Sequence, residues 1–258
     1  MGKMNMSTNN KKRKIKRILC ISLCAVLLVV VAFVGSSLMT KRPAIESIDY
    51  YTGVYDEVNI TEYENDSFII EPKDPAKEQS VGIVFYCGAQ ITPDAYVPLM
   101  AELAQKGYCC WIPKMTCNMA SLSHNAAQKI IDSNPLIETW IVAGHSMGGL
   151  TASGFADDHI DEVDGLVLLA AYSNRDLSKY DLPVLSIYGD CDTVMNYENY
   201  QERISWLPDD FEELIISGAN HAQYGDYGDQ PRDSATAISG EEQRSITVNC
   251  IDEWIQKT

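Results

Sequence analysis

A glycine-flanked serine near the middle of the chain has the surroundings of a reactive nucleophile. Ser146 lies in the segment Gly144-His145-Ser146-Met147-Gly148, which follows an apolar run and precedes a helix-compatible stretch. A serine on a sharp turn between a strand and a helix presents its hydroxyl at the edge of a sheet. The N-terminus of the helix then directs free backbone N–H groups toward the reacting atoms. We therefore predict that Ser146 attacks an electrophilic carbon.

A serine hydroxyl becomes an effective nucleophile only when a base removes its proton and an acid orients that base. Of the four histidines, His221 is the one that follows the last predicted strand. His124 and His159 lie before a strand, in helical or acidic surroundings, and we expect them at the surface. His145 lies inside the serine turn, where we expect its side chain to point away. His221, at the carboxyl end of the last run, is therefore a candidate for the base.

Two aspartates are candidates for the orienting acid. Asp190 and Asp192 lie in the segment Gly189-Asp190-Cys191-Asp192-Thr193-Val194, directly after an apolar run at residues 184–188. The carboxyl end of a strand is where a parallel sheet gathers its functional residues. The residue types alone leave the choice between the two carboxylates open.

These residues must be positioned by a sheet, because short apolar runs recur along the chain. Several are nearly continuous in apolar residues, which is typical of strands buried on both faces of a parallel sheet. The runs are residues 68–70, 81–86, 108–112, 140–143, 165–170, 184–188 and 213–216. Helix-compatible stretches occupy residues 94–106, 126–133, 149–157, 197–205 and 241–256. This alternation predicts an α/β fold with a doubly wound, mostly parallel sheet flanked by helices.

The six residues GHSMGG, from Gly144 to Gly149, resemble the serine turn of the α/β-hydrolase superfamily, and the resemblance covers residues 65–258. In that superfamily the order along the chain is serine, acid, histidine, and the histidine follows the last strand, so the resemblance implies that His221 is the base. Similar enzymes place the acid third after a glycine and shortly before a valine. The resemblance therefore implies that Asp192 is the acid, and that Asp190 caps a turn or supports the site.

The same resemblance implies two backbone donors for the negatively charged oxygen that forms during acyl transfer. One is the N–H of Met147, the residue after the serine. The other belongs to the loop Cys87-Gly88-Ala89-Gln90, where the residue after the glycine donates, so we assign Ala89 with Gln90 as its neighbour. Cys87 stands where many relatives have a histidine.

The substrate site is expected to be open. Residues 171–183 are too few to form the helical lid that many relatives insert before the acid. The chain resembles small lidless enzymes of the dienelactone-hydrolase type, which use cysteine in place of Ser146, as well as carboxylesterases and polyester and cutin hydrolases. Uncharacterised bacterial hydrolases share its Asn-His-Ala-Gln run. Tyr224 and Tyr227, in the long loop after His221, could line the site.

We expect no metal and no cofactor. Three aspartates follow the catalytic histidine, but their spacing matches no calcium-loop pattern. Outside the first 42 residues 11 Lys and Arg face 36 Asp and Glu, a net charge of −25. Nucleic acid is therefore excluded as a partner, because its binding needs a basic surface. The expected partner is a small-molecule or acylated substrate. The six cysteines beyond residue 42 match no metal or disulfide pattern, and a bridge from Cys109 or Cys110 to Cys117 is left open because an exported domain permits disulfides.

The N-terminal residues have the pattern of a membrane anchor. Residues 1–17 carry seven positive charges and no acid, and residues 18–39 are uncharged. A helix over these 22 residues reaches roughly 33 Å, enough to cross the hydrocarbon core. The basic flank predicts a cytoplasmic N-terminus, a single-pass location in the cell membrane and an extracytoplasmic catalytic domain. A cleaved signal peptide, with the site Val34-Gly35-Ser36, would make the domain secreted instead.

The sequence thus predicts a basic tail at 1–17, a transmembrane signal anchor at 18–39, a linker and first edge strand at 40–64, and an α/β-hydrolase domain at 65–258. The function we predict is hydrolysis of a carboxylic ester through an acyl-enzyme. The alternatives are a thioesterase or amidase, an acyltransferase that uses the same residues, or a catalytically silent, membrane-tethered binding domain.

Overall fold

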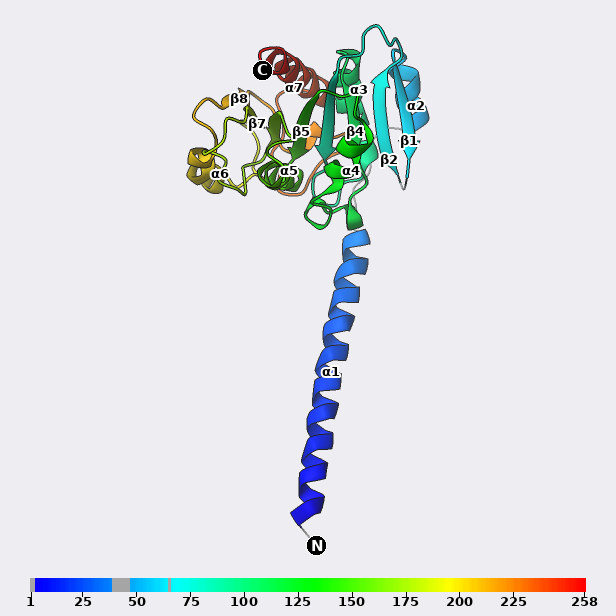
Figure 1. Cartoon of the computed structure of the whole chain (residues 1–258), viewed down its shortest axis with the longest axis vertical. Helices are drawn as coiled ribbons and strands as arrows, with labels where there is room; N and C mark the ends of the chain where they lie inside the picture. The colour runs from blue at the N-terminus through cyan, green and yellow to red at the C-terminus, as the bar shows by residue number, and fades with distance from the viewer. Residues whose placement is uncertain (1–2, 39–46, 65) are drawn as a thin grey trace. The chain divides into compact units, whose positions relative to one another are not determined.

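The computed structural model describes residues 3–38, 47–64 and 66–258 (Figure 1). The chain divides into two compact units, residues 1–40 and residues 41–258. The predicted boundaries at residues 39–40 and at residue 65 lie outside the described residues.

The first unit contains one long helix, α1 (Lys3–Leu38). Its segment Ile15–Ala32 has a mean hydropathy of 2.5, and none of it is buried. By length and composition this segment is able to cross a membrane, as a permanent anchor or as a signal sequence. The predicted apolar span therefore forms a helix.

The second unit is built on an eight-stranded sheet in the order β1-β2-β4-β3-β5-β6-β7-β8. The pairs β1–β2 and β2–β4 are antiparallel, and all other neighbours are parallel. Strands β3 to β8 are therefore all parallel to one another, and their carboxyl ends lie at the same edge of the sheet. The strands are β1 (Val58–Tyr63), β2 (Ser67–Pro72), β3 (Val81–Tyr86), β4 (Cys109–Ile112), β5 (Thr139–His145), β6 (Gly165–Leu169), β7 (Val184–Gly189) and β8 (Glu212–Ile216).

Helices cover both faces of the sheet and bury its apolar side chains (Figure 1). One core cluster joins Phe85 and Ile141 to α2, α3 and α7, and the other joins Val84 and Val142 to α4 and α5. Alternate residues of a strand point to opposite faces, which explains why neighbours such as Val84 and Phe85 enter different clusters. The helices are α2 (Ile48–Val54), α3 (Val97–Gln105), α4 (Ala126–Ser133), α5 (Met147–Asp158), α6 (Tyr197–Arg203) and α7 (Gly240–Ile255).

The fold class predicted from the sequence is confirmed. Every predicted apolar run contributes a strand, and every predicted helical stretch contributes a helix. Helix α2 was not predicted, because its residues were assigned to the linker. Residues 170–183, between β6 and β7, contain neither helix nor strand, so no helical lid is inserted there.

Candidate active site

The turn between β5 and α5 holds Ser146 in a strained conformation. Its backbone has φ 54° and ψ −121°, so φ lies in the left-handed region. Such a conformation costs about 1–3 kcal/mol at a non-glycine residue and persists only where the surroundings impose it. The N–H of Ser146 donates to the carbonyl of Leu169 in the neighbouring strand β6 at 2.9 Å. The backbone of Ser146, a partly exposed residue, is thereby fixed at the carboxyl edge of the sheet.

Two glycines allow this turn because the backbone packs tightly around it. A Cβ on Gly148 would lie 1.9 Å from the carbonyl oxygen of Tyr86, and one on Gly144 would lie 2.4 Å from the carbonyl carbon of Gly148. Both distances are far below carbon contact distances of about 3.5–4.0 Å. The first turn of α5 is thus pressed against the end of β3, where the next loop begins.

His221 and Asp192 form a buried contact. They follow β8 and β7, and His221 Nδ1 lies 2.7 Å from Asp192 Oδ2. Only 2% and 1% of the two side chains are exposed. A carboxylate only accepts, so the ring donates its Nδ1–H and its Nε2 is left able to accept a proton. The other carboxylate oxygen accepts the N–H groups of Val194 and Met195 at 2.8 and 2.9 Å.

Asp190 has a different set of contacts. Its carboxylate accepts the N–H of Gly218 at 2.6 Å and the hydroxyl of Ser217 at 3.0 Å. These two hydrogen bonds, that of Gly218 first, lower the pKa of Asp190 below its ordinary value. Asp190 therefore holds the turn that precedes His221, whereas Asp192 touches the ring itself.

The loop after β3 leaves one N–H free at the edge of the sheet. The N–H of Gly88 donates to the hydroxyl of Tyr96 at 3.0 Å, and that of Gln90 donates to the carbonyl of Asn118 at 2.6 Å. Among the described residues, no acceptor is bonded to the N–H of Ala89 between them. The N–H of Met147, at the start of α5, has no intrahelical partner either. The two N–H groups assigned to an oxyanion are therefore both available.

The side chain of His145 is buried beside His221, so our expectation that it points away is wrong. His145 is fully buried, and its ring centroid lies 4.6 Å from that of His221. It shares a strand face with Ile141 and Ala143, because side chains of a strand alternate with a period of two. His145 directly precedes Ser146 in the chain, and its ring packs on that of His221. The serine turn and His221 therefore lie close together.

We expect His145 to make folding stability depend on pH. Burial, and then the nearby His221, lower the pKa of His145 well below its ordinary value of 6.5. Its ring faces the titratable residues Tyr96, His221 and Tyr224. Below pH 6.5 the unfolded chain binds a proton that the folded chain rejects. The contribution of His145 to the free energy of unfolding is therefore fully present above pH 6.5. It falls below that pH by at most about 1.4 kcal/mol per pH unit.

This pH dependence can be measured by thermal unfolding between pH 6.5 and 5. The variant His145→Asn has no titrating group at this position, so its Tm should fall less steeply with decreasing pH than that of the natural chain. Equal slopes for the two proteins would contradict the assignment of a buried neutral ring.

The other histidines lie at the surface. The His124 and His159 side chains are 32% and 22% exposed and contact the carboxylates of Asp158 and Glu162. Cys87, directly after β3, is buried, and burial raises the pKa of its thiol, so it remains protonated. All eight cysteines are free.

Tyr224 and Tyr227 are core residues and do not form a substrate surface, contrary to our expectation. They are 1% and 6% exposed. The 3-10 turn η5 (Ala222–Tyr224) directs the chain inward after His221, and the ring of Tyr224 packs 5.5 Å from that of His145. Local sequence gives no sign of this inward path. Among the described residues, no group of three or more His, Cys, Asp or Glu side chains could hold a metal ion.

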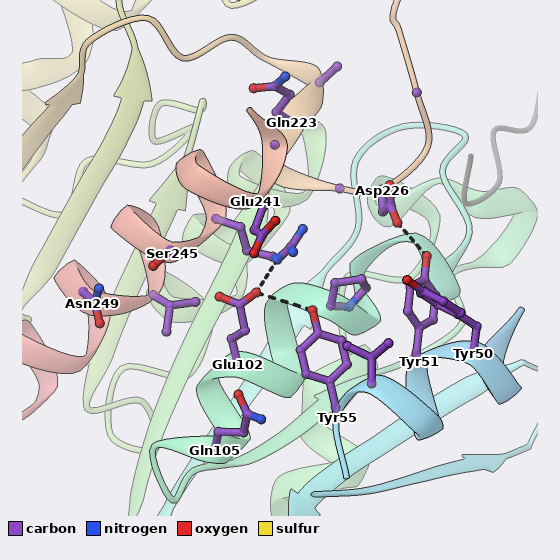
Figure 2. A pocket seen from close by; sticks show the side chains of 18 of the residues that line it. Tyr50, Tyr51, Tyr55, Glu102, Gln105, Gln223, Asp226, Glu241, Ser245 and Asn249 are labelled. Atoms are coloured by element: carbon purple, nitrogen blue, oxygen red, sulfur yellow. Dashed lines mark hydrogen bonds and ion pairs between the residues drawn. The ribbon is translucent and has the colours of Figure 1, made fainter. Parts of the chain in front are cut away.

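A cavity of about 780 Å³ lies beside residues 222–229, against α2, α3 and α7 (Figure 2). Figure 2 shows Tyr51 directed toward Asp226 and Tyr55 directed toward Glu102, with oxygen–oxygen distances of 2.7 and 3.4 Å. Ser146 does not line this cavity. The cavity is thus separate from the serine turn, although it borders the segment that follows His221.

Replacing Tyr51 with phenylalanine is expected to destabilise the fold by about 1–3 kcal/mol, because the hydrogen bond that the Tyr51 hydroxyl donates to the charged carboxylate of Asp226 is lost. Tyr51 is 3% exposed and joins α2 to a loop 175 residues away. Tyr50 is 49% exposed and provides the control, since Tyr50→Phe should change stability by less than about 0.5 kcal/mol. Thermal unfolding of the two variants tests this, and equal Tm values would contradict an anchoring role for Tyr51.

The sheet order, the strained serine turn and the loops at the carboxyl edge define an α/β-hydrolase fold. Residues 82–245 match the sequence profile of the alpha/beta hydrolase family. The chain belongs to this family and is a hydrolase. A search of curated protein sequences gives no significant match.

Solved structures share the fold at low sequence identity. A predicted CIB-like hydrolase from Thermoplasma acidophilum has a TM-score of 0.57 and 16% identity, covering 76% of this chain and 99% of its own. Est1E from Butyrivibrio proteoclasticus has a TM-score of 0.57 and 15% identity, with 78% and 99% coverage. MGS-MChE2, an alpha/beta hydrolase enzyme from a lagoon-sediment metagenome of Mar Chica, Morocco, has a TM-score of 0.57 and 17% identity, covering 77% of this chain and 98% of its own.

Proposed function

We propose that this hydrolase is a serine esterase in which Ser146 attacks the carbonyl carbon of a carboxylic ester. His221 takes the serine proton at Nε2 as the new C–O bond forms, and returns it to the leaving alkoxide as the acyl-enzyme forms. The same ring then deprotonates a water molecule, which attacks the acyl-enzyme and releases the acid. Asp192 orients the ring and stabilises its charged form, and the N–H groups of Ala89 and Met147 bind the oxyanion.

The contact between His221 and Asp192 is the observation that carries this proposal. A buried carboxylate needs hydrogen-bond partners, and Asp192 has them on both oxygens: the imidazole of His221 at 2.7 Å on one, and two backbone N–H groups on the other. The strained Ser146 lies one residue from His145, whose ring packs on that of His221. Together these features support a nucleophile, a base and an orienting acid at one edge.

The open edge favours esters over reactions that must exclude water. Residues 170–183 form no helix that would cover Ser146, and Ala89, Ser146 and Met147 are all partly exposed. Transfer of the acyl group to another acceptor requires that water be kept away from the acyl-enzyme. Hydrolysis therefore fits an uncovered site better than acyl transfer does.

A panel of p-nitrophenyl esters with acyl chains of rising length tests the proposal on the purified full-length chain. We expect release of p-nitrophenol, with lower kcat/KM for matched p-nitroanilides. Faster turnover of anilides or thioesters would replace the esterase by an amidase or thioesterase, and product transfer to an added alcohol would indicate an acyltransferase. No turnover of any substrate would favour a binding domain.

We also propose that α1 anchors the enzyme in the cell membrane with residues 41–258 outside the cytoplasm. The basic N-terminal flank supports this orientation. A membrane-impermeant maleimide applied to intact cells should label the partly exposed Cys191. Labelling only after lysis would contradict the orientation, and recovery of a chain without residues 1–36 in the medium would favour a cleaved signal.

A further inference from the structure

The hydroxyl of Tyr96 touches both segments that carry the proposed oxyanion donors. Tyr96 ends the short 3-10 helix η1 (Pro93–Tyr96), and its side chain is fully buried. Its oxygen accepts the N–H of Gly88 at 3.0 Å and lies 2.8 Å from Nδ1 of His145. Gly88 directly precedes Ala89, and His145 lies two residues before Met147. One hydroxyl group thus connects the loop after β3 to the serine turn.

The protons of this network can be counted. A backbone N–H only donates, so the oxygen of Tyr96 accepts from Gly88, and its single proton is directed to Nδ1 of His145. Burial raises the pKa of Tyr96 and lowers that of His145, so both side chains are neutral. The neutral ring of His145 therefore carries its proton on Nε2. Nε2 has no hydrogen-bond partner among the described residues, so this tautomer leaves one buried group unsatisfied. The opposite tautomer would leave two, the hydroxyl proton of Tyr96 and the lone pair of Nε2.

The packing around Gly88 leaves little freedom. A Cβ at this position would lie 2.9 Å from both His145 Nδ1 and the Tyr96 oxygen, and 3.0 Å from Ile91 Cδ1. The ring of His145 is in turn held between those of Tyr96 and His221, at centroid distances of 5.9 and 4.6 Å. The backbone before Ala89 is thus held directly against the buried side chain of the serine turn.

We propose that Tyr96 and His145 are positioning residues that keep the N–H groups of Ala89 and Met147 aimed at one oxyanion. This inference rests on the proposed esterase mechanism of Ser146. The two donors lie on loops that are more than 50 residues apart in sequence. Donors of this kind must be held within about 0.5 Å of the productive geometry. The Tyr96 hydroxyl supplies the direct bond between their supporting segments.

The variant Tyr96→Phe keeps the ring and removes this bond. The oxyanion exists only in the transition state and the tetrahedral intermediate, so a misaligned donor lowers kcat and leaves KM nearly unchanged. Loss of one donor costs about 10²–10³ in kcat, so misalignment of one donor should lower kcat by about 10–100-fold. A boronic acid, whose tetrahedral adduct with Ser146 carries an oxyanion, should bind more weakly by a similar factor.

Tyr108→Phe is the matched control for the loss of a buried tyrosine hydroxyl. Tyr108 is also fully buried, and its hydroxyl donates to Asp252 in α7 at 2.7 Å. Both variants should lose stability, but only Tyr96→Phe should lose kcat per active site, with active sites titrated by a fluorophosphonate. A purely structural role would change the fraction of folded protein. Because the titration counts only active sites, kcat per active site does not depend on that fraction.

A pair of His145 variants gives a second test if Tyr96→Phe folds poorly. Asparagine can place its amide oxygen near the position of Nδ1 and accept the Tyr96 proton, whereas leucine cannot. His145→Asn should therefore retain more kcat per titrated site than His145→Leu, with similar KM. Equal kcat for the two variants would overturn the inference, as would a Tyr96→Phe enzyme within twofold of the natural kcat.

The outcomes separate this inference from the proposed function. If the natural chain reacts with the fluorophosphonate and hydrolyses esters while Tyr96→Phe keeps its kcat and its boronic-acid affinity, only the positioning role fails. If the natural chain neither reacts nor hydrolyses esters, the esterase proposal fails and this inference fails with it.

Discussion

Replacing Ser146 with alanine is expected to lower kcat for ester hydrolysis by about 10⁶-fold, to the rate that substrate binding and the oxyanion site alone sustain. Without the hydroxyl there is no acyl-enzyme, and the base His221 has no proton to take. Alanine is also a non-glycine residue at φ 54°, so the backbone strain of the turn is unchanged. The loss should therefore reflect chemistry and not a change in the fold.

Initial rates on a p-nitrophenyl ester, with Ser133→Ala as the control, measure this effect. Ser133 ends α4, and its exposed hydroxyl donates to the carbonyl of Lys129 within the same helix. The control should keep its full rate. A Ser146→Ala enzyme that retains a tenth of the natural kcat would show that another group is the nucleophile.

Replacing Asp192 with asparagine is expected to lower kcat by about 10⁴-fold. One carboxylate oxygen accepts the N–H groups of Val194 and Met195, so the asparagine carbonyl must take that position. Its NH₂ group then faces Nδ1 of His221, which has to accept, and the ring proton moves to Nε2. A ring protonated at Nε2 is unable to take the proton of Ser146, although the geometry is preserved.

Asp190→Asn is the matched control, because it changes the same residue type two positions away. Its carboxylate is exposed and bonded to the turn at Ser217 and Gly218, so kcat should fall by less than about tenfold. Comparison of kcat for the two asparagine variants decides between the aspartates. A larger loss for Asp190→Asn than for Asp192→Asn would contradict the assignment.

The sheet was predictable from sequence because its strands carry their own signal. Strands β3 and β5 are almost continuously apolar, as expected for strands buried on both faces. Helix α2 carried no such signal. It has seven residues, of which Tyr51 is the buried one, and isolated helices this short are unstable in water. Its position depends on contacts such as that with Asp226, which no local pattern reveals.

The candidate site divides in the same way. The serine turn and the order of Ser146, Asp192 and His221 are visible in the sequence, and their assigned roles remain predictions. The contact between Asp192 and His221 is a matter of tertiary structure. The same is true of Tyr96, which lies in the predicted helical stretch 94–106 and which no sequence pattern connected to the site. Its hydroxyl reaches His145 because η1 and the end of β5, which are far apart in the sequence, come together in the folded chain.

Fluorophosphonate labelling of the folded full-length chain, followed by peptide mass mapping, tests the central claim most directly. We expect a single covalent adduct on Ser146, formed by the folded protein and absent after heat denaturation, because a serine hydroxyl reacts only when a base and oxyanion donors activate it. Folded protein that forms no adduct, or forms it on a residue other than Ser146, would contradict the account.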